Sequence, residues 1–209
     1  PIPSRGLGDV YKRQVQSSRV NDANDNGWNV NGAGHDVSHK YGFGVIDASA
    51  AVALAENWVN VDPEINFQSG LIDVPDRQIP DNSAPGISEI TNVPDSIKVE
   101  HVEVIVDIDH SYRGDLEIIL TSPSGTQSVL SEKHEDSGNN WNNWMFTSVH
   151  HWDEDSFGNW TLSIEDQGNG DTGTLFDWEL NIYGTEINTD RDGDGLTNYD
   201  EVSIYGTDP

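Results

Sequence analysis

The chain has 209 residues, of which 37 are Asp or Glu and 10 are Lys or Arg, so its formal net charge at pH 7 is −27. This charge repels phosphate backbones and anionic lipid surfaces, which excludes nucleic acid as an expected partner. Cysteine is absent, so disulfides and thiolate metal sites are excluded, and packing or calcium must stabilise any extracellular domain. No apolar run reaches the length of about 18 residues that a membrane-spanning helix needs, so no membrane span is expected.

The first fourteen residues differ from the rest of the chain. Residues 9–14 read DVYKRQ, which resembles the translation of an adapter end used in transposon-based sequencing libraries. We therefore expect residues 1–14 to be a scar of sequencing and not part of the natural protein. On this expectation the chain is a fragment, and its natural N-terminus lies upstream.

A short helix is predicted within residues 15–60. The stretch DASAAVALAENW, residues 47–58, begins with Asp47, a residue type that caps helix N-termini. One face of the predicted helix carries Ala48, Ala51, Val52 and Ala55. This narrow, Ala-rich stripe suits close contact with a larger body, which these residues cannot supply by themselves.

Residues 61–184 are predicted to form an antiparallel β-sandwich. Residues 60–96 are rich in Pro, Asp, Asn and Ser, which indicates a linker that leads into the domain. Apolar residues then alternate over 102–108, 116–120, 160–164 and 178–182, so each segment can bury one face of a strand. The turn sequences between them, such as SYRGD and SPSGT, are spaced as in an all-β sandwich and leave no room for crossover helices.

The tail, residues 185–209, contains a twelve-residue calcium loop, DRDGDGLTNYDE at 190–201. Gly195 stands where such loops turn sharply. The loop positions that supply oxygen ligands are occupied by Asp190, Asp192, Asp194, Leu196 through its carbonyl, Asn198 through water, and Glu201 with both carboxylate oxygens. Calcium is therefore the expected cofactor.

A second calcium site would form if four further turn carboxylates met in space. These are Asp109, Asp115, Glu154 and Asp166. The alternative is that they remain unpaired turn residues. His35 and His39 lie four residues apart, but they lack a third ligand and an HExxH frame, so we interpret them as loop residues and not as a zinc site.

Two other features allow more than one interpretation. Arg113-Gly114-Asp115 spells the tripeptide of cell-adhesion ligands, but a Gly followed by an Asp between two strands favours a turn. Trp160 and Trp178 are in phase with buried strand residues and are predicted to be core. Trp141 and Trp144 could belong to the core or to an aromatic platform for a ligand, and the sequence does not decide between them.

Three segments carry a resemblance to a known family. They are DIDHSYRGDLEIILTSPSGTQSVL at 107–130, HWDEDSFGNWTLSIED at 151–166 and GDTGTLFDWELNIYG at 170–184. In this order they resemble the P domain, or homo B domain, of the proprotein convertases. The segment 28–58, with its SHKYGFG turn, is similar to the end of the catalytic domain of subtilisin/kexin-like serine proteases. The tail resembles one thrombospondin type 3 or EF-hand-like repeat.

The resemblance implies an all-β, jelly-roll β-sandwich over residues 61–184, a catalytic-domain remnant over 15–60, and a calcium-binding repeat over 185–209. It further implies a domain that stabilises the catalytic domain and tunes its calcium and pH dependence. No GTSxAxP segment, which carries the nucleophile in subtilases, is present, so no catalytic role is assigned to any residue.

We therefore expect the non-catalytic end of a secreted, extracellular, bacterial serine endopeptidase, and we expect the chain to be a monomer. Its partners would be the catalytic domain of the same polypeptide and the protein substrates of the parent enzyme. The alternative is a free-standing β-sandwich module that binds carbohydrate or a surface partner.

Overall fold

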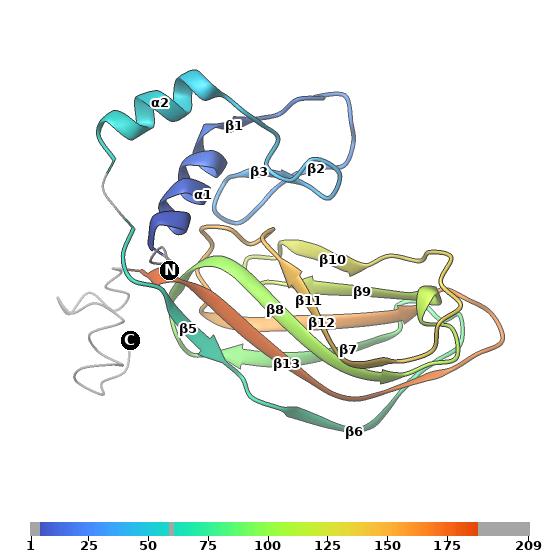
Figure 1. Cartoon of the computed structure of the whole chain (residues 1–209). Helices are drawn as coiled ribbons and strands as arrows, with labels where there is room; N and C mark the ends of the chain where they lie inside the picture. Colours follow the sequence, from blue (N-terminus) through green and yellow to red (C-terminus); the bar gives the residue numbers. More distant parts are fainter. Residues whose placement is uncertain (1–4, 59–60, 188–209) are drawn as a thin grey trace, which may run out of the picture.

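The structure is a computed structural model that describes residues 5–58 and 61–187. It shows a β-sandwich with a small segment of helices and short strands against one end (Figure 1). Within the described residues, no helix has the length and apolar character needed to span a membrane. The helices are α1 (Arg5–Ser17), α2 (Ala48–Glu56) and the 3-10 turn η1 (Arg113–Asp115).

The N-terminal segment contains two small antiparallel pairs. One joins β1 (Ser18–Arg19) to β4 (Val45–Ile46), and the other joins β2 (Trp28–Val30) to β3 (Asp36–Ser38). Helices α1 and α2 pack against each other, and α2 lies farther from the sandwich than α1 does (Figure 1).

The sandwich consists of two antiparallel sheets. The four-stranded sheet has the order β10-β9-β12-β7, and the other has the order β11-β8-β13-β5, with β6 also paired to β13. The strands are β5 (Ile65–Gln68), β6 (Ile72–Ile79), β7 (Ile87–Val93), β8 (Ile97–Asp109), β9 (Leu116–Thr121), β10 (Gln127–Ser131), β11 (Trp141–Ser148), β12 (Gly158–Asp166) and β13 (Gly173–Glu186).

The core lies between these sheets, and it follows from the alternation in the sequence. From Val102 to Ile108, every second residue of β8 points inward, and Val102, Val104, Val106 and Ile108 are all fully buried. Trp160 on β12 and Trp178 on β13 are also fully buried, as predicted. Each such side chain contributes about 1.5–3 kcal/mol through its removal from water. The prediction of an all-β sandwich is confirmed.

The predicted linker over residues 60–96 is corrected by the structure. This region contains β5, β6 and β7, which are full members of the two sheets. Strand β6 includes Pro75, which lies where the register with β13 shifts between Asp73 and Arg77. A proline is tolerated there because it cannot donate to a ladder that is already interrupted.

The predicted helix at residues 47–58 is confirmed as α2. Oδ1 of Asp47 accepts hydrogen bonds from the backbone N–H groups of Ser49, at 2.9 Å, and of Ala50, at 3.0 Å. None of the residues of α2 is buried, and Val52 is 63% exposed. Helix α1 runs across residue 14, and the assignment of residues 1–14 to a scar stays a prediction.

Candidate docking site

The N-terminal segment contacts the sandwich through the loop of residues 31–44, which we call the docking loop. On the sandwich side, the contacts come from the turn of residues 122–126, from β10 and from the loop of residues 149–155. These elements meet at the end of the sandwich that lies beneath β2 and β3 (Figure 1). The contacts join residues that are about 90 to 120 positions apart in the chain.

Asn31 bridges the two parts with a single buried side chain. Its Nδ2 donates to the carbonyl oxygens of His150, at 3.0 Å, and of Trp152, at 2.9 Å. Its Oδ1 accepts from the backbone N–H groups of Ala33, at 3.1 Å, and of His35, at 3.0 Å. The amide therefore shapes the docking loop and attaches it to the sandwich at the same time, and no donor or acceptor of the amide is left without a partner.

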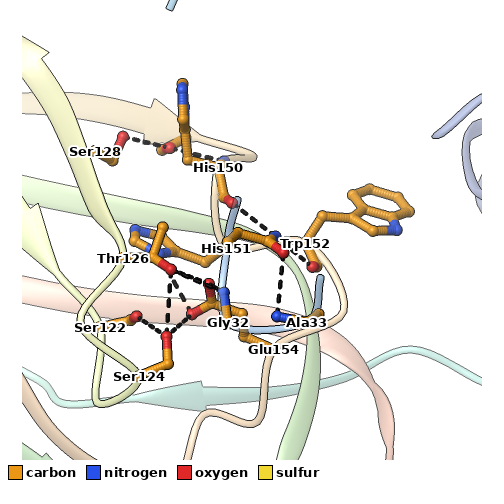
Figure 2. Close-up of polar contacts among 12 residues, drawn as sticks. Gly32, Ala33, Ser122, Ser124, Thr126, Ser128, His150, His151, Trp152 and Glu154 are labelled. Carbon is orange, nitrogen blue, oxygen red and sulfur yellow. Dashed lines mark hydrogen bonds and ion pairs between the residues drawn. The ribbon is translucent and has the colours of Figure 1, made fainter. Parts of the chain in front are cut away.

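Glu154 is the buried carboxylate of the site, with 2% of its surface exposed. Its Oε1 accepts from the backbone N–H of Gly32, at 2.7 Å, and from Oγ1 of Thr126, at 2.5 Å, while its Oε2 accepts from Oγ of Ser124, at 2.9 Å (Figure 2). A Cβ atom at position 32 would lie 2.3 Å from Oγ of Ser124, so only glycine fits there. The docking loop thus completes the shell of hydrogen-bond donors around a carboxylate of the sandwich.

This shell keeps Glu154 ionised although it is buried. Burial by itself raises the pKa of the carboxyl, but His151 beside it and the hydrogen bonds from Ser122, Thr126 and the N–H of Gly32 lower that pKa to about 2. Nδ1 of His151 lies 3.7 Å from Oε2 of Glu154. A buried charge that accepts several hydrogen bonds is strongly tied to them, because removal of the donors would leave it unpaired.

Asp153 makes the neighbouring ionic contact. Its Oδ2 lies 2.9 Å from Nε2 of His35 on the docking loop, and its Oδ1 lies 3.5 Å from Nζ of Lys98 and 3.6 Å from Nζ of Lys12. Burial raises the pKa of Asp153, but the hydrogen bond from His35 and the two lysines outweigh burial and lower it. His35 is therefore a docking contact.

His39 reaches the sandwich at strand β10. Its Nε2 accepts a hydrogen bond from the backbone N–H of Val129, at 2.8 Å, and its ring stacks on His150 with a centroid distance of 4.0 Å. Burial lowers the pKa of His39, and burial together with the neighbouring rings of His39 and His151 lowers the pKa of His150 to about 4. Both rings are thus neutral at pH 7, and His39 must be neutral because a protonated Nε2 cannot accept a hydrogen bond.

The pH dependence of this pair has a definite sign. A histidine whose pKa is lowered in the folded chain contributes stability above its ordinary value of 6.5, and this contribution is lost as the pH falls toward the folded value.

An aromatic contact closes the site. Phe43 packs in a T-shaped arrangement with His35 and with the buried Trp152, at centroid distances of 6.2 and 6.3 Å. The following residue, Gly44, has a positive φ of 98°, and a Cβ atom there would lie 2.2 Å from the carbonyl oxygen of Arg19. Glycine therefore allows the backbone to approach β1 closely and to direct Phe43 to the sandwich.

The four residues of the predicted second calcium site are not brought together. Asp166 is buried beside His110, with Oδ2 3.3 Å from Nε2, and Asp115 pairs with Lys133 at 3.6 Å. Asp109 is exposed at the end of β8. Glu154 precedes β12 while Asp166 ends it, so these two lie at opposite ends of the sandwich. Over the described ranges, no three His, Asp or Glu side chains are placed to share a metal ion.

The calcium loop with Asp190, Asp192, Asp194, Leu196, Asn198 and Glu201 lies outside the described residues. The tripeptide at 113–115 is the 3-10 turn η1, in which Nε of Arg113 lies 2.8 Å from Oδ2 of Asp136 and Gly114 is buried. Trp141 is 6% exposed and has the guanidinium of Arg113 4.8 Å from its ring centre, whereas Trp144 is 47% exposed.

Two family models match separate parts of the chain. Residues 99–182 match the model described as the proprotein convertase P-domain. Residues 190–209 match the model described as the bacterial TSP3 repeat. The first match lies inside the sandwich, and the second includes the calcium loop.

Curated relatives are similar over most of this chain. Proprotein convertase subtilisin/kexin type 4 of Mus musculus is 38% identical over 186 residues, which are 85% of this chain and 28% of the relative. Furin-1 of Xenopus laevis is 36% identical over 205 residues, 91% of this chain and 25% of the relative. The chain thus spans about a quarter of the length of these relatives.

A solved structure has the same fold. The serine protease of Aeromonas sobria, crystallised in complex with its chaperone, superposes with a TM-score of 0.80 at 23% identity. The match covers 89% of this chain and 41% of that protein, so the likeness extends beyond the sandwich.

Proposed function

This chain belongs to the proprotein convertase P-domain family of subtilisin/kexin-like proteases, and on that premise we propose that it is the C-terminal, non-catalytic part of a secreted, calcium-dependent serine endopeptidase. In this proposal the sandwich docks on the catalytic domain of the same polypeptide and stabilises it. The substrates of the whole enzyme are proteins, and the chemistry takes place on residues upstream of this chain.

The observation that carries the proposal is the insertion of the docking loop into the polar network of Asn31 and Glu154. The loop belongs to the segment 28–58, which is similar to the end of a subtilase catalytic domain. Because Glu154 and Gly32 hold the last part of that domain, they restrain its unfolding from the C-terminal side. Stability gained in this way is lost when the contact is broken, which makes the sandwich a regulator of the catalytic domain.

The test of this proposal is the reading frame upstream of Val15 in the source DNA. We expect a subtilase catalytic domain that includes a GTSxAxP segment with the nucleophilic serine. A stop codon or an unrelated domain in that position would contradict the proposal. It would favour a free-standing β-sandwich module instead.

Secretion and calcium dependence are parts of the same proposal. The absence of cysteine and the large negative charge suit a domain that is stabilised by calcium in an oxidising, ion-rich exterior. Loop 190–201 supplies the ligand positions, and the match of residues 190–209 to the TSP3 repeat supports this assignment.

We expect calcium titration by calorimetry to give a binding heat for the wild-type chain and none for Asp192→Ala. Extracellular loops of this type bind with a Kd of about 10⁻⁴ to 10⁻³ M, and at ten times Kd the bound ion stabilises the tail by about 1.4 kcal/mol. Asp208→Ala, in the same tail but outside the twelve-residue loop, is the control and should bind as the wild type does. Identical heats for all three proteins would refute the calcium loop.

A further inference from the structure

A cavity of about 590 Å³ lies between the N-terminal segment and the sandwich, next to the docking site. Its walls are largely apolar and come from both parts of the chain. They include Val15, Phe43, Ile46, Val61, Val149 and Trp152. Phe43 and Trp152 also form the aromatic contact of the docking site, so the cavity continues the interface already described.

A carboxylate is directed into this apolar space by an irregularity in strand β8. In the ladder with β13, His101 pairs with Tyr183 and Val99 pairs with Gly184. Glu100 therefore has no paired residue on β13 and forms a β-bulge. Such bulges change the direction of one side chain. A Cβ atom on Gly184 would lie 2.0 Å from the carbonyl oxygen of Lys98, so the bulge depends on glycine at this position.

One oxygen of the Glu100 carboxylate is unsatisfied within the described part of the chain. Its Oε1 is buried and accepts no hydrogen bond from any of the described residues. Burial raises the pKa of Glu100, and nearby Glu64 adds to this effect, while Lys12 lowers it. A buried acceptor without a donor is costly, so the geometry indicates that a donor from elsewhere belongs in the cavity.

The cation that Lys12 provides comes from the segment predicted to be a scar, and it is also shared with Asp153 at 3.6 Å. Without residues 1–14, the cavity would lose Tyr11 and Gln14 from its wall and the positive charge of Lys12, while Glu64 and Glu100 would remain. An apolar wall with a carboxylate inside fits a side chain that has an aliphatic stem and a cationic head.

We propose that the cavity receives an arginine or lysine side chain from the polypeptide upstream of residue 15, and that Glu100 pairs with its charged head. This inference rests on the proposed function, because the occupant would belong to the catalytic domain that is proposed to precede residue 15; the chain spans about a quarter of the length of its relatives. It adds a specific partner for a specific residue to the general contact between the two domains.

The test uses the purified full chain and n-butylguanidine, which carries the head and part of the stem of arginine. We expect NMR shift changes at Val149 and Trp152 on titration, and an affinity for N-butylurea, its neutral isostere, that is lower by about tenfold or more. Glu100→Gln should weaken n-butylguanidine to the level of the urea. Lys12→Gln, which removes the competing cation, should strengthen it.

Glu117→Gln, which changes the same type of side chain on β9, is the matched control and should leave the affinity unchanged. Equal binding of the two probes, or unchanged binding in Glu100→Gln, would overturn the inference without affecting the docking proposal. Conversely, an upstream frame without a catalytic domain would overturn the proposed function even if the cavity binds n-butylguanidine.

Discussion

Replacement of Glu154 by alanine is expected to lower the free energy of unfolding of the chain by about 3 kcal/mol. The substitution removes the buried carboxylate that accepts from the N–H of Gly32 and from the hydroxyls of Ser124 and Thr126. It also opens a space where the docking loop meets the sandwich. Since the loop depends on this contact, protection of the amide hydrogens of residues 31–44 from exchange should fall more than protection of the core.

Urea unfolding followed by circular dichroism measures the effect, and Glu135→Ala, at an exposed carboxylate, is the control. The pH dependence gives a second readout. The pKa of Glu154 is about 2 in the folded chain against an ordinary value of 4.5, so its contribution is complete above pH 4.5 and is lost as the pH falls toward 2. Glu154→Gln should therefore flatten this part of the stability profile. Equal stabilities of Glu154→Ala and Glu135→Ala would contradict the role of Glu154.

Replacement of Trp160 by alanine should cost about 3–5 kcal/mol, because it empties the centre of the sandwich. Trp160 is fully buried, its Nε1 donates to the carbonyl oxygen of Ser156 at 2.8 Å, and its ring packs against the edge of His151 at 4.9 Å. Loss of the ring therefore removes core packing and also the support of a histidine that lies beside Glu154.

Trp144→Ala is the matched substitution at a side chain that is 47% exposed, and we expect it to cost about 1 kcal/mol. Thermal and urea unfolding of the two variants should differ clearly in midpoint, with similar slopes against urea. If the two substitutions had the same effect, the assignment of Trp160 to the core and of Trp144 to the surface would be wrong.

The central strands of the fold could be predicted because their alternation is complete. Strand β8 lies between β11 and β13, and every second residue from Val102 to Ile108 is apolar, so its pattern specifies one buried face. Strand β6 has no such signal. It contains Pro75, and its position depends on pairing with β13, whose residues lie about 100 positions later in the chain.

The docking site could be predicted only in part. The asparagine, glycine and histidines of the docking loop resemble ordinary loop residues, and their partners lie 90 or more positions away. The prediction that Glu154 and Asp166 bind the same calcium ion could have been checked from the length of the intervening strand alone. Strand β12 begins after Glu154 and ends at Asp166, and its nine residues span about 26 Å from first to last, which is too far for two ligands of one ion.

Strand β10 forms one border of its sheet, where backbone groups have no neighbouring strand to pair with. In this chain the backbone N–H of Val129 on that border donates a hydrogen bond to the imidazole of His39. In a sandwich truncated to begin at residue 61, this N–H would have no partner. Exposed edge strands of this kind promote β-pairing between molecules. Retention of the preceding residues therefore also protects the solubility of the domain.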